Sequence, residues 1–331
     1  MAIPDAAKNL FVGVDVGGTK VAAGLVNPQG QIVANLRKPM VADADAAAGL
    51  ASVTDAIDAL FASNPEVRET IRGIGVCAPG PLDPNTGVVI NPPNLKCWRN
   101  FPLATEISQR YGVRVKVDND ANAAALAEVL WGAGRGYKYV FYATIGTGIG
   151  TGIIFDGCIY HGRTGAAGEG GHVSIDCHGP VCGCGKRGCI EVLASGTAIA
   201  RRAREKLAVE PQCGSALREL AGGKIETVTG EMVGRANAAG DPLATEILVE
   251  TAELLAVWLG NTVDLLDPDV IIIGGGAAAL LRPFFDEIRK RMERHCVNSR
   301  YMEVPLVPAF YGADSGIAGG AALLCNCAQA R

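Results

Sequence analysis

The distribution of apolar positions predicts a chain that alternates between strands and helices. Residues 10–26, LFVGVDVGGTKVAAGLV, form two apolar runs around a pair of glycines, a pattern typical of a β-hairpin with a glycine-rich turn. Segment 43–62 is rich in alanine and its apolar residues recur at helical spacing, and short strands are predicted at 73–77 and 113–117. The first third of the chain is therefore expected to be mixed α/β.

The rest of the chain repeats parts of this plan. Residues 139–155 again form two apolar runs around a Gly/Thr turn, and this weak internal repeat suggests two domains of related topology. A helix is predicted from Ala121, a buried strand at 270–276, and a last helix after Asp314 whose small residues allow close packing against a neighbour. The proline and asparagine residues of segment 91–98 predict a loop that can face a ligand.

Composition narrows the class of protein. A length of 331 residues suggests about two domains, and 49% hydrophobic with 19% charged residues excludes a disordered chain. The net charge of −4 includes no block of like charge, so no nucleic acid or membrane partner is expected. Eleven cysteines, an odd number, and an N-terminus without a signal-peptide pattern favour a reducing compartment, and we expect a cytoplasmic protein.

Two glycine turns are candidates for phosphate binding. Backbone N–H groups of Gly17, Gly18, Thr19 and Lys20 could bind phosphate, with Asp15 beside them to hold Mg²⁺ through water. The turn is neither a Walker A loop nor a Rossmann fingerprint, and by itself it is explained better by a plain tight hairpin. A second turn at 144–150, TIGTGIG, favours a shared polyphosphate ligand. Glycines 274–276 end a buried strand, where ligands of α/β sheets bind, although strand-to-helix packing explains them as well.

Asp120 is the candidate general base. It follows Asn119 between a predicted strand and a predicted helix, which makes it a natural helix N-cap. The same carboxylate could accept the proton of an attacking hydroxyl group, and the two roles are compatible.

The most specific pattern is a candidate metal site. His172, Cys182, Cys184 and Cys189 are spaced H-x9-C-x-C-x4-C with glycines between the thiols. Three thiolates and one imidazole make a closed tetrahedral set for a structural Zn²⁺. Free thiols or disulfides, and Cys177 or His178 as substitute ligands, are the alternatives.

Two carboxylates flank this metal pattern. Glu169 and Glu191 are either solvated surface groups or, held by the metal loop, fixed hydrogen-bond acceptors for a polyol. His161 and His295 have no partner pattern, and the sequence assigns them no role.

The motifs DVGGTK, APGPLDP, NPPNL, NDANAAALAE, TIGTGIG, GAAGEGGH and CGCGKRGCIE together resemble the ROK family of repressors and sugar kinases over nearly the whole chain. The resemblance implies an actin-like ATPase (ribonuclease H-like) fold, with two α/β domains flanking a cleft. We expect one domain at residues 1–118 with a returning C-terminal helix at 314–331, and a larger domain with the zinc loop at 119–313. It also favours a homo-oligomer, a dimer or tetramer.

The resemblance implies a role for each motif. Asp120 is similar to the family's catalytic base. The turn residues Gly17 to Lys20 with Thr147 and Gly148 are similar to its phosphate-binding turns, and Gly274, Gly275 and Gly276 to its adenosine-side glycines. The residues similar to its sugar-binding set are Asn94, Asn119, Glu169, His172 and Glu191, with His172 expected to bind zinc through one ring nitrogen and a sugar hydroxyl through the other.

The expected reaction is transfer of a phosphoryl group from MgATP to the 6-hydroxyl of an aldohexose. The loops APGPLDPNTGVV and NPPNL are most similar to the glucokinase branch. N-acetylmannosamine, N-acetylglucosamine and fructose kinases of the same family are alternatives. A repressor is disfavoured because the first predicted strand begins near Leu10, which leaves no room for a helix-turn-helix, and a non-catalytic sensor is disfavoured because Asp120 is present.

Overall fold

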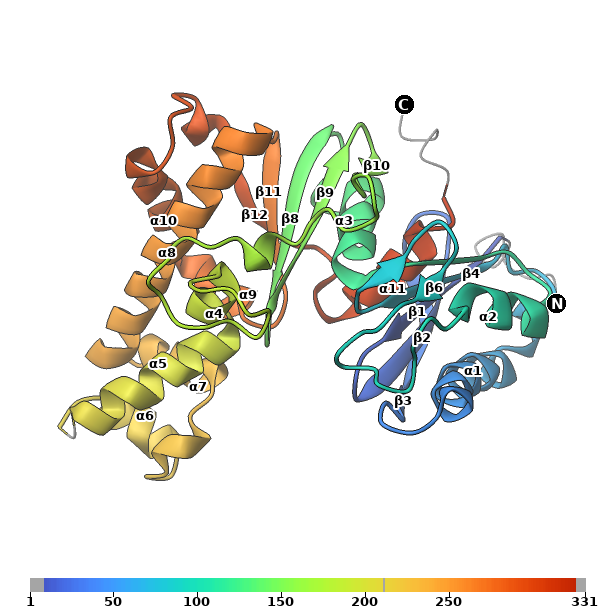
Figure 1. Cartoon of the computed structure of the whole chain (residues 1–331), viewed down its shortest axis with the longest axis horizontal. Helices are drawn as coiled ribbons and strands as arrows, with labels where there is room; N and C mark the ends of the chain where they lie inside the picture. The colour runs from blue at the N-terminus through green and yellow to red at the C-terminus, as the bar shows by residue number, and fades with distance from the viewer. Residues whose placement is uncertain (1–8, 211, 326–331) are drawn as a thin grey trace. The chain divides into compact units, whose positions relative to one another are not determined.

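The computed structural model describes residues 9–210 and 212–325, and the chain divides into two compact units (Figure 1). The first unit contains residues 1–140, 152–168 and 310–331, and the second contains 141–151 and 169–309. Two of the four boundaries fall inside the adjacent strands β8 (Tyr139–Ile145) and β9 (Ile149–Phe155). The two predicted hairpins, β1–β2 and β8–β9, both exist, so this part of the sequence interpretation is confirmed.

The first unit is built on a five-stranded sheet of order β3-β2-β1-β4-β7. Strands β1 to β3 are antiparallel, whereas β1, β4 and β7 run parallel to one another. Strand β3 alternates between half-buried and exposed residues, as expected of an edge strand with one solvated face. The strands are β1 (Phe11–Val16), β2 (Lys20–Val26), β3 (Ile32–Pro39), β4 (Ile74–Ala78) and β7 (Val115–Asn119), with the small hairpin β5 (Leu82–Asp83) and β6 (Val88–Val89) beside them.

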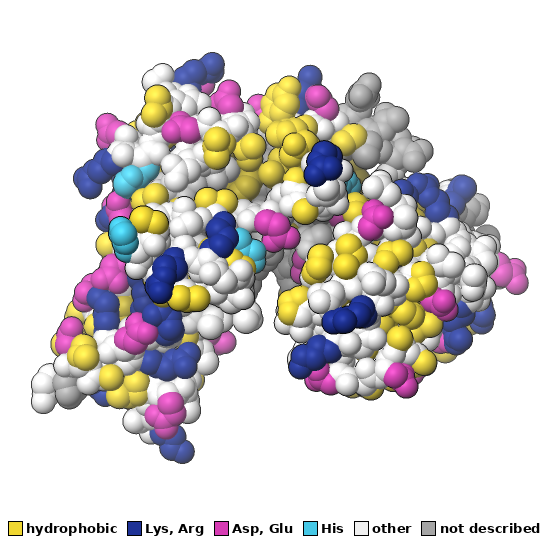
Figure 2. Space-filling view, viewed as in Figure 1, with side chains coloured by type: hydrophobic (Ala, Val, Ile, Leu, Met, Phe, Trp, Pro, Cys, Tyr) yellow, Lys and Arg dark blue, Asp and Glu magenta, His cyan; other side chains and the backbone are white. Residues whose placement is uncertain are grey.

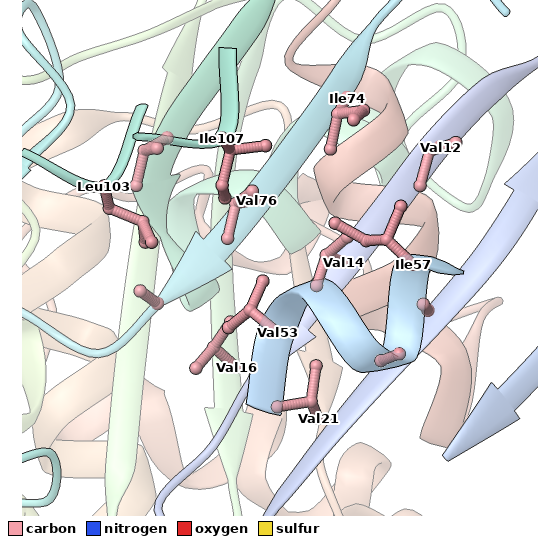
Figure 3. Packing of buried hydrophobic residues seen from close by; sticks show 14 of the residues in the cluster. Val12, Val14, Val16, Val21, Val53, Ile57, Ile74, Val76, Leu103 and Ile107 are labelled. Atoms are coloured by element: carbon pink, nitrogen blue, oxygen red, sulfur yellow. The ribbon is translucent and has the colours of Figure 1, made fainter. Parts of the chain in front are cut away.

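Helices cover this sheet and close its core. They are α1 (Ala46–Ser63), α2 (Leu103–Tyr111), α3 (Asp120–Trp131) and α11 (Ser315–Ala322). Figure 3 shows aliphatic side chains from α1 meeting those of the central strands, among them Val53 and Ile57 of α1 with Val14 of β1 and Val76 of β4. Helix α1 has the length and hydropathy of a membrane-spanning helix, but its face toward the sheet is buried in this core, as in the core helices of globular units.

Helix α11 lies unusually close to the sheet. A Cβ atom on Gly75 of β4 would lie 1.7 Å from the carbonyl oxygen of Gly320, and one on Gly13 of β1 would lie 1.8 Å from that of Ile317. The prediction that small residues in the last helix allow close packing is therefore confirmed. Helix α11 also packs on α3, since a Cβ on Gly319 would meet the backbone of α3. This packing places residues 119–140 in the first unit, whereas the sequence-based boundaries assigned them to the second domain.

The second unit combines strands of a five-stranded sheet with a group of helices. The sheet has the order β10-β9-β8-β11-β12. Its strands β11 (Val270–Gly274) and β12 (Leu306–Pro308) belong wholly to the second unit, whereas β10 (Cys158–Ile159) belongs to the first. The helices are α4 (Ile190–Ala194), α5 (Gly196–Val209), α6 (Ser215–Leu220), α7 (Gly230–Ala238), α8 (Pro242–Leu266), α9 (Ala278–Leu281) and α10 (Phe285–Arg291). Basic side chains of α5 pair with acidic ones of α8, such as Arg202 with Glu250, and Figure 2 shows both charges interspersed over these helices.

Candidate active site

The first glycine turn lies in the first unit, between β1 and β2. The Gly17 N–H donates to the Lys20 carbonyl at 2.9 Å, which closes the turn, and Thr19 and Lys20 are exposed. A Cβ atom on Gly18 would lie 2.9 Å from the carbonyl oxygen of Asn94, so the loop at 91–98 lies directly against this turn. The structure therefore brings Asn94 to the turn.

Two carboxylates stand at the ends of two strands in the sheet of the first unit, on either side of β4. Asp15 is near the end of β1 and Asp120 follows β7. Burial first, and then the negative charge of Asp120, raise the pKa of Asp15 from 3.8 to about 6, against the lowering effect of Lys20 and Arg37. Two acidic groups that repel each other in this way can bind a divalent cation, whose charge offsets the repulsion.

The start of α3 differs from the sequence interpretation in one respect. Asn119, not Asp120, is the N-cap: its Oδ1 accepts from the N–H groups of Ala121 at 2.9 Å and Asn122 at 3.3 Å. The prediction that Asp120 caps the helix is wrong, because β7 continues through Asn119 and the helix begins at Asp120. Asp120 is exposed in the first turn of the helix, where the helix dipole favours a negative charge.

The candidate metal residues come together in the second unit. Ligand atoms of His172, Cys182, Cys184 and Cys189 all lie within 4.8 Å of one another. The Cys184 and Cys189 sulfurs are 3.7 Å apart, and His172 Nδ1 is 3.7 Å from the Cys182 sulfur. A tetrahedral Zn²⁺ with bonds of about 2.3 Å to sulfur separates its sulfur ligands by about 3.8 Å, so these residues fit the ion.

The thiol chemistry of the cluster agrees with this fit. Burial, and then the neighbouring Cys184 and Cys182 thiols, raise the pKa of Cys189 to about 12, an effect that a bound cation offsets. The described cysteines form no disulfide, and the alternative ligands Cys177 and His178 are exposed and lie outside the cluster.

Glu191 joins the metal loop to the second glycine turn. Its Oε2 accepts from the Ile149 N–H at 2.9 Å, and its Oε1 lies 3.9 Å from His172 Nδ1. A Cβ atom on Gly148 would lie 2.4 Å from Glu191 Oε2, so a larger residue at this position would displace the Glu191 carboxylate. Glu169 is exposed one residue before the 3₁₀ turn Gly170–His172, and its carbonyl accepts from the His172 N–H at 3.0 Å. Glu191 is therefore a fixed acceptor, whereas the Glu169 side chain faces solvent.

A cavity of about 420 Å³ lies beside the second turn in the same unit. Its wall includes Gly146 and Thr147, the first residues of α5 and α7, and Gly276. Of the three glycines at the end of β11, only Gly276 lines the cavity. Gly274 and Gly275 lie against β8, where added Cβ atoms would collide with Tyr142 and Ile145. Two helix N-termini and a glycine turn favour a ligand that carries negative charge.

Some residues of these sites were not found from the sequence. The helix starts at the cavity have N-caps, Ser195 for α5 and Thr229 for α7, and this capping pattern was a signal that could have located them. His161, to which the sequence assigned no role, pairs with Asp118 beside the candidate base.

Strand-end carboxylates, glycine turns and a cavity at helix N-termini, carried by two α/β units, define a phosphotransferase of the actin-like ATPase class. The ROK family model matches residues 11–326, and the chain belongs to the ROK family. A glucokinase of Streptomyces coelicolor is 34% identical over 315 residues, 95% of this chain and 97% of the relative. An N-acetylmannosamine kinase of Vibrio cholerae is 30% identical over 310 residues, 93% of this chain and 96% of the relative.

A solved structure gives the same result. The chain is similar to a ROK family glucokinase from Streptomyces griseus in complex with glucose and AMPPNP, with a TM-score of 0.80 and 35% identity over 95% of this chain and 99% of that one. The expected fold is confirmed, and the protein is an ATP-dependent sugar kinase.

Proposed function

We propose that this kinase is a glucokinase, which transfers the γ-phosphoryl group of MgATP to the 6-hydroxyl of glucose. The observation that carries the proposal is the match, across 95% of the chain, to a glucokinase solved with glucose and AMPPNP. The glucokinase of S. coelicolor, at 34% identity, supports the same substrate.

We assign the proton transfer to Asp120. Its carboxylate is exposed at the first turn of α3, and the Asn119 cap holds the backbone on which it stands. As the hydroxyl attacks phosphorus, Asp120 accepts its proton, a contribution of about 10²- to 10⁴-fold in rate. Most of the remaining acceleration comes from positioning and charge neutralisation, because phosphoryl transfer needs little covalent chemistry from the protein.

We assign the phosphate contacts to the glycine turns. Backbone N–H groups at Gly18 to Lys20 and at Thr147 and Gly148 would bind phosphate oxygens, whereas the Gly17 N–H closes the first turn. Asp15 would hold the Mg²⁺ of MgATP through water. The Mg²⁺ that accompanies ATP neutralises charge on the transferring group. Gly276 contributes to the wall of the nucleoside site, and Gly274 and Gly275 act by fixing β11 against β8.

We assign sugar binding to five polar side chains: Asn94, Asn119, Glu169, His172 and Glu191. Asn119 Oδ1 is occupied by the helix cap, so its amide nitrogen is the group that meets the sugar. His172 offers Nδ1 toward Cys182, and we propose that a structural Zn²⁺ binds there with Cys184 and Cys189. That ion supplies rigidity, and Nε2 of the same ring then donates to or accepts from a sugar hydroxyl.

The test is kcat/KM for glucose, N-acetylmannosamine, N-acetylglucosamine and fructose under identical MgATP. A site built to hydrogen-bond a hydroxyl rejects an analogue that leaves its polar groups unpaired, by up to about 10⁴- to 10⁵-fold. We expect glucose to be used best. An equal or higher value for N-acetylmannosamine would instead support the second candidate function, which the 30% identical V. cholerae enzyme favours.

Two further properties stay predictions. We propose a cytoplasmic location on the basis of the cysteine content, and cell fractionation tests it. The homo-oligomer follows from family resemblance, and light scattering of the purified chain tests it.

A further inference from the structure

A buried polar cluster lies at the end of β7, next to the residue we assign as the base. Asp118 is only 5% exposed. Its Oδ1 accepts from the Asn119 N–H at 2.7 Å and from the Asn122 amide at 3.3 Å, and its Oδ2 lies 2.7 Å from His161 Nε2. Because an ionised carboxylate only accepts hydrogen bonds, His161 Nε2 carries the proton.

His161 is itself held in a tight loop of the same unit. Its carbonyl accepts from the Ala167 N–H at 3.1 Å, and a Cβ atom on Gly162 would lie 3.0 Å from that of Ala167. A Cβ atom on Gly165 would lie 3.0 Å from Pro84, so the loop also packs against the residues that follow β5. The imidazole therefore reaches Asp118 from a fixed position.

Asp118 connects His161 to the backbone segment that carries Asp120. One of its oxygens accepts from the backbone N–H of Asn119, the residue that caps α3 and precedes Asp120. If the His161 bond is lost, the buried carboxylate loses one of its three donors and is free to rotate away from the Asn119 N–H. The backbone at Asn119 and Asp120 then loses a constraint that sets where the Asp120 carboxylate points.

We propose that Asp118 and His161 are positioning residues for phosphoryl transfer: the hydrogen bond between them orients Asp120 through the backbone of Asn119. This inference rests on the proposed role of Asp120 as the base. Neither residue contacts the reacting atoms, so their effect is on kcat, because misplacement of a catalytic group by about 1 Å costs up to about 10²-fold.

The first test compares two substitutions of His161. His161→Phe keeps a ring of similar size but removes the N–H, whereas His161→Gln keeps a neutral N–H donor near the position of Nε2. We expect His161→Phe to lower kcat with glucose by about 10- to 100-fold while KM for ATP stays within about threefold. His161→Gln should restore kcat to within about threefold of wild type.

His295 offers a matched control. It also donates to a carboxylate, with Nε2 2.9 Å from Glu253 Oε1, and its side chain is 24% exposed against 32% for His161. His295→Phe should leave kcat unchanged. An unaltered kcat in His161→Phe, an equal loss in His161→Gln, or the same loss in His295→Phe would each overturn the proposal.

Amide hydrogen exchange provides a readout that needs no substrate. In His161→Phe, with a melting temperature that shows a folded protein, exchange should be faster than in wild type at 118–122 and at 161–168. Unchanged exchange in both segments contradicts the proposal. A wild-type protein that phosphorylates no hexose refutes the proposed function instead, while the exchange experiment still decides whether the His161 bond orders the start of α3.

Discussion

The unusual electrostatics of Asp15 lead to a prediction in which stability and activity change in opposite directions. Burial and the charge of Asp120 raise the pKa of Asp15 from 3.8 to about 6 in the folded chain. At neutral pH the folded protein therefore holds the ionised Asp15 carboxylate where burial and the charge of Asp120 both disfavour ionisation. The substitution Asp15→Asn removes that charge and preserves the shape of the side chain.

The magnitude follows from proton linkage. A rise in pKa from 3.8 to about 6 corresponds to about 3 kcal/mol at most when Asp15 is fully ionised. Because the side chain is only partly buried, solvent screening reduces this to about 1–2 kcal/mol. For a unit of this size the melting temperature rises by about 2–8 °C.

The sign depends on pH in a defined way. Between 3.8 and about 6 the folded state binds more protons than the unfolded state, so wild-type stability falls as pH rises through this window. Asp15→Asn does not lose stability in this window. The difference in free energy of unfolding between the variant and wild type therefore reaches its full value above pH 7 and is about a third as large at pH 4.5.

Melting temperatures of wild type and variant from pH 4.5 to 8 measure this effect, with Asp55→Asn, an exposed carboxylate of α1, as the control. Kinase activity of Asp15→Asn should fall sharply in the same samples, since a stabilising change at a functional carboxylate removes function. An Asp15→Asn protein no more stable than wild type at pH 7.5, or a difference that is independent of pH, would refute the reasoning.

Three other predictions concern the metal site, the sheet and a buried carboxylate. Protein purified without chelator should contain one Zn²⁺ per chain by elemental analysis, and Cys184→Ser should lower that content; a chain without zinc contradicts the assignment. Gly75→Ala should lower the free energy of unfolding by about 1–3 kcal/mol in urea titrations, because its Cβ would lie 1.7 Å from a carbonyl oxygen of α11. A variant as stable as wild type would show that α11 can shift away from β4 without cost. The carboxylate of the fully buried Glu128 accepts from the N–H groups of Ala133, Phe310 and Tyr311. Glu128→Ala should therefore lower the free energy of unfolding by about 3 kcal/mol, and Glu128→Gln should lower it less. Equal losses in the two variants would contradict the assignment of this stability to the hydrogen bonds.

The sequence predicted features that depend on nearby residues. The metal ligands cluster as their spacing indicated, since His172 and the three cysteines lie within one loop-rich segment. Both hairpins form where glycines interrupt apolar runs, and the last helix packs closely because its residues are small. In these cases local chemistry determines the outcome.

Contacts between residues distant in sequence were not predictable in this way. The bonds of Glu191 to Ile149 and of Asp118 to His161 join residues 42 and 43 positions apart, and Glu128 reaches Phe310 across 182 positions. No periodicity encodes such pairs, because they depend on how strands and loops meet after folding. The shift of the N-cap from Asp120 to Asn119 has another cause: both residue types cap helices well, and the end of β7 decides between them.

The catalytic role of Asp120 is tested most directly by the turnover of Asp120→Asn with MgATP and glucose. Asn119 supplies the helix cap through its bond to the Ala121 N–H, so the substitution leaves the start of α3 intact. We predict that glucose affinity stays within a few-fold of wild type while kcat falls by about 10²- to 10⁴-fold, since asparagine cannot accept the hydroxyl proton. A folded Asp120→Asn enzyme that phosphorylates glucose at near wild-type rate would contradict the mechanism.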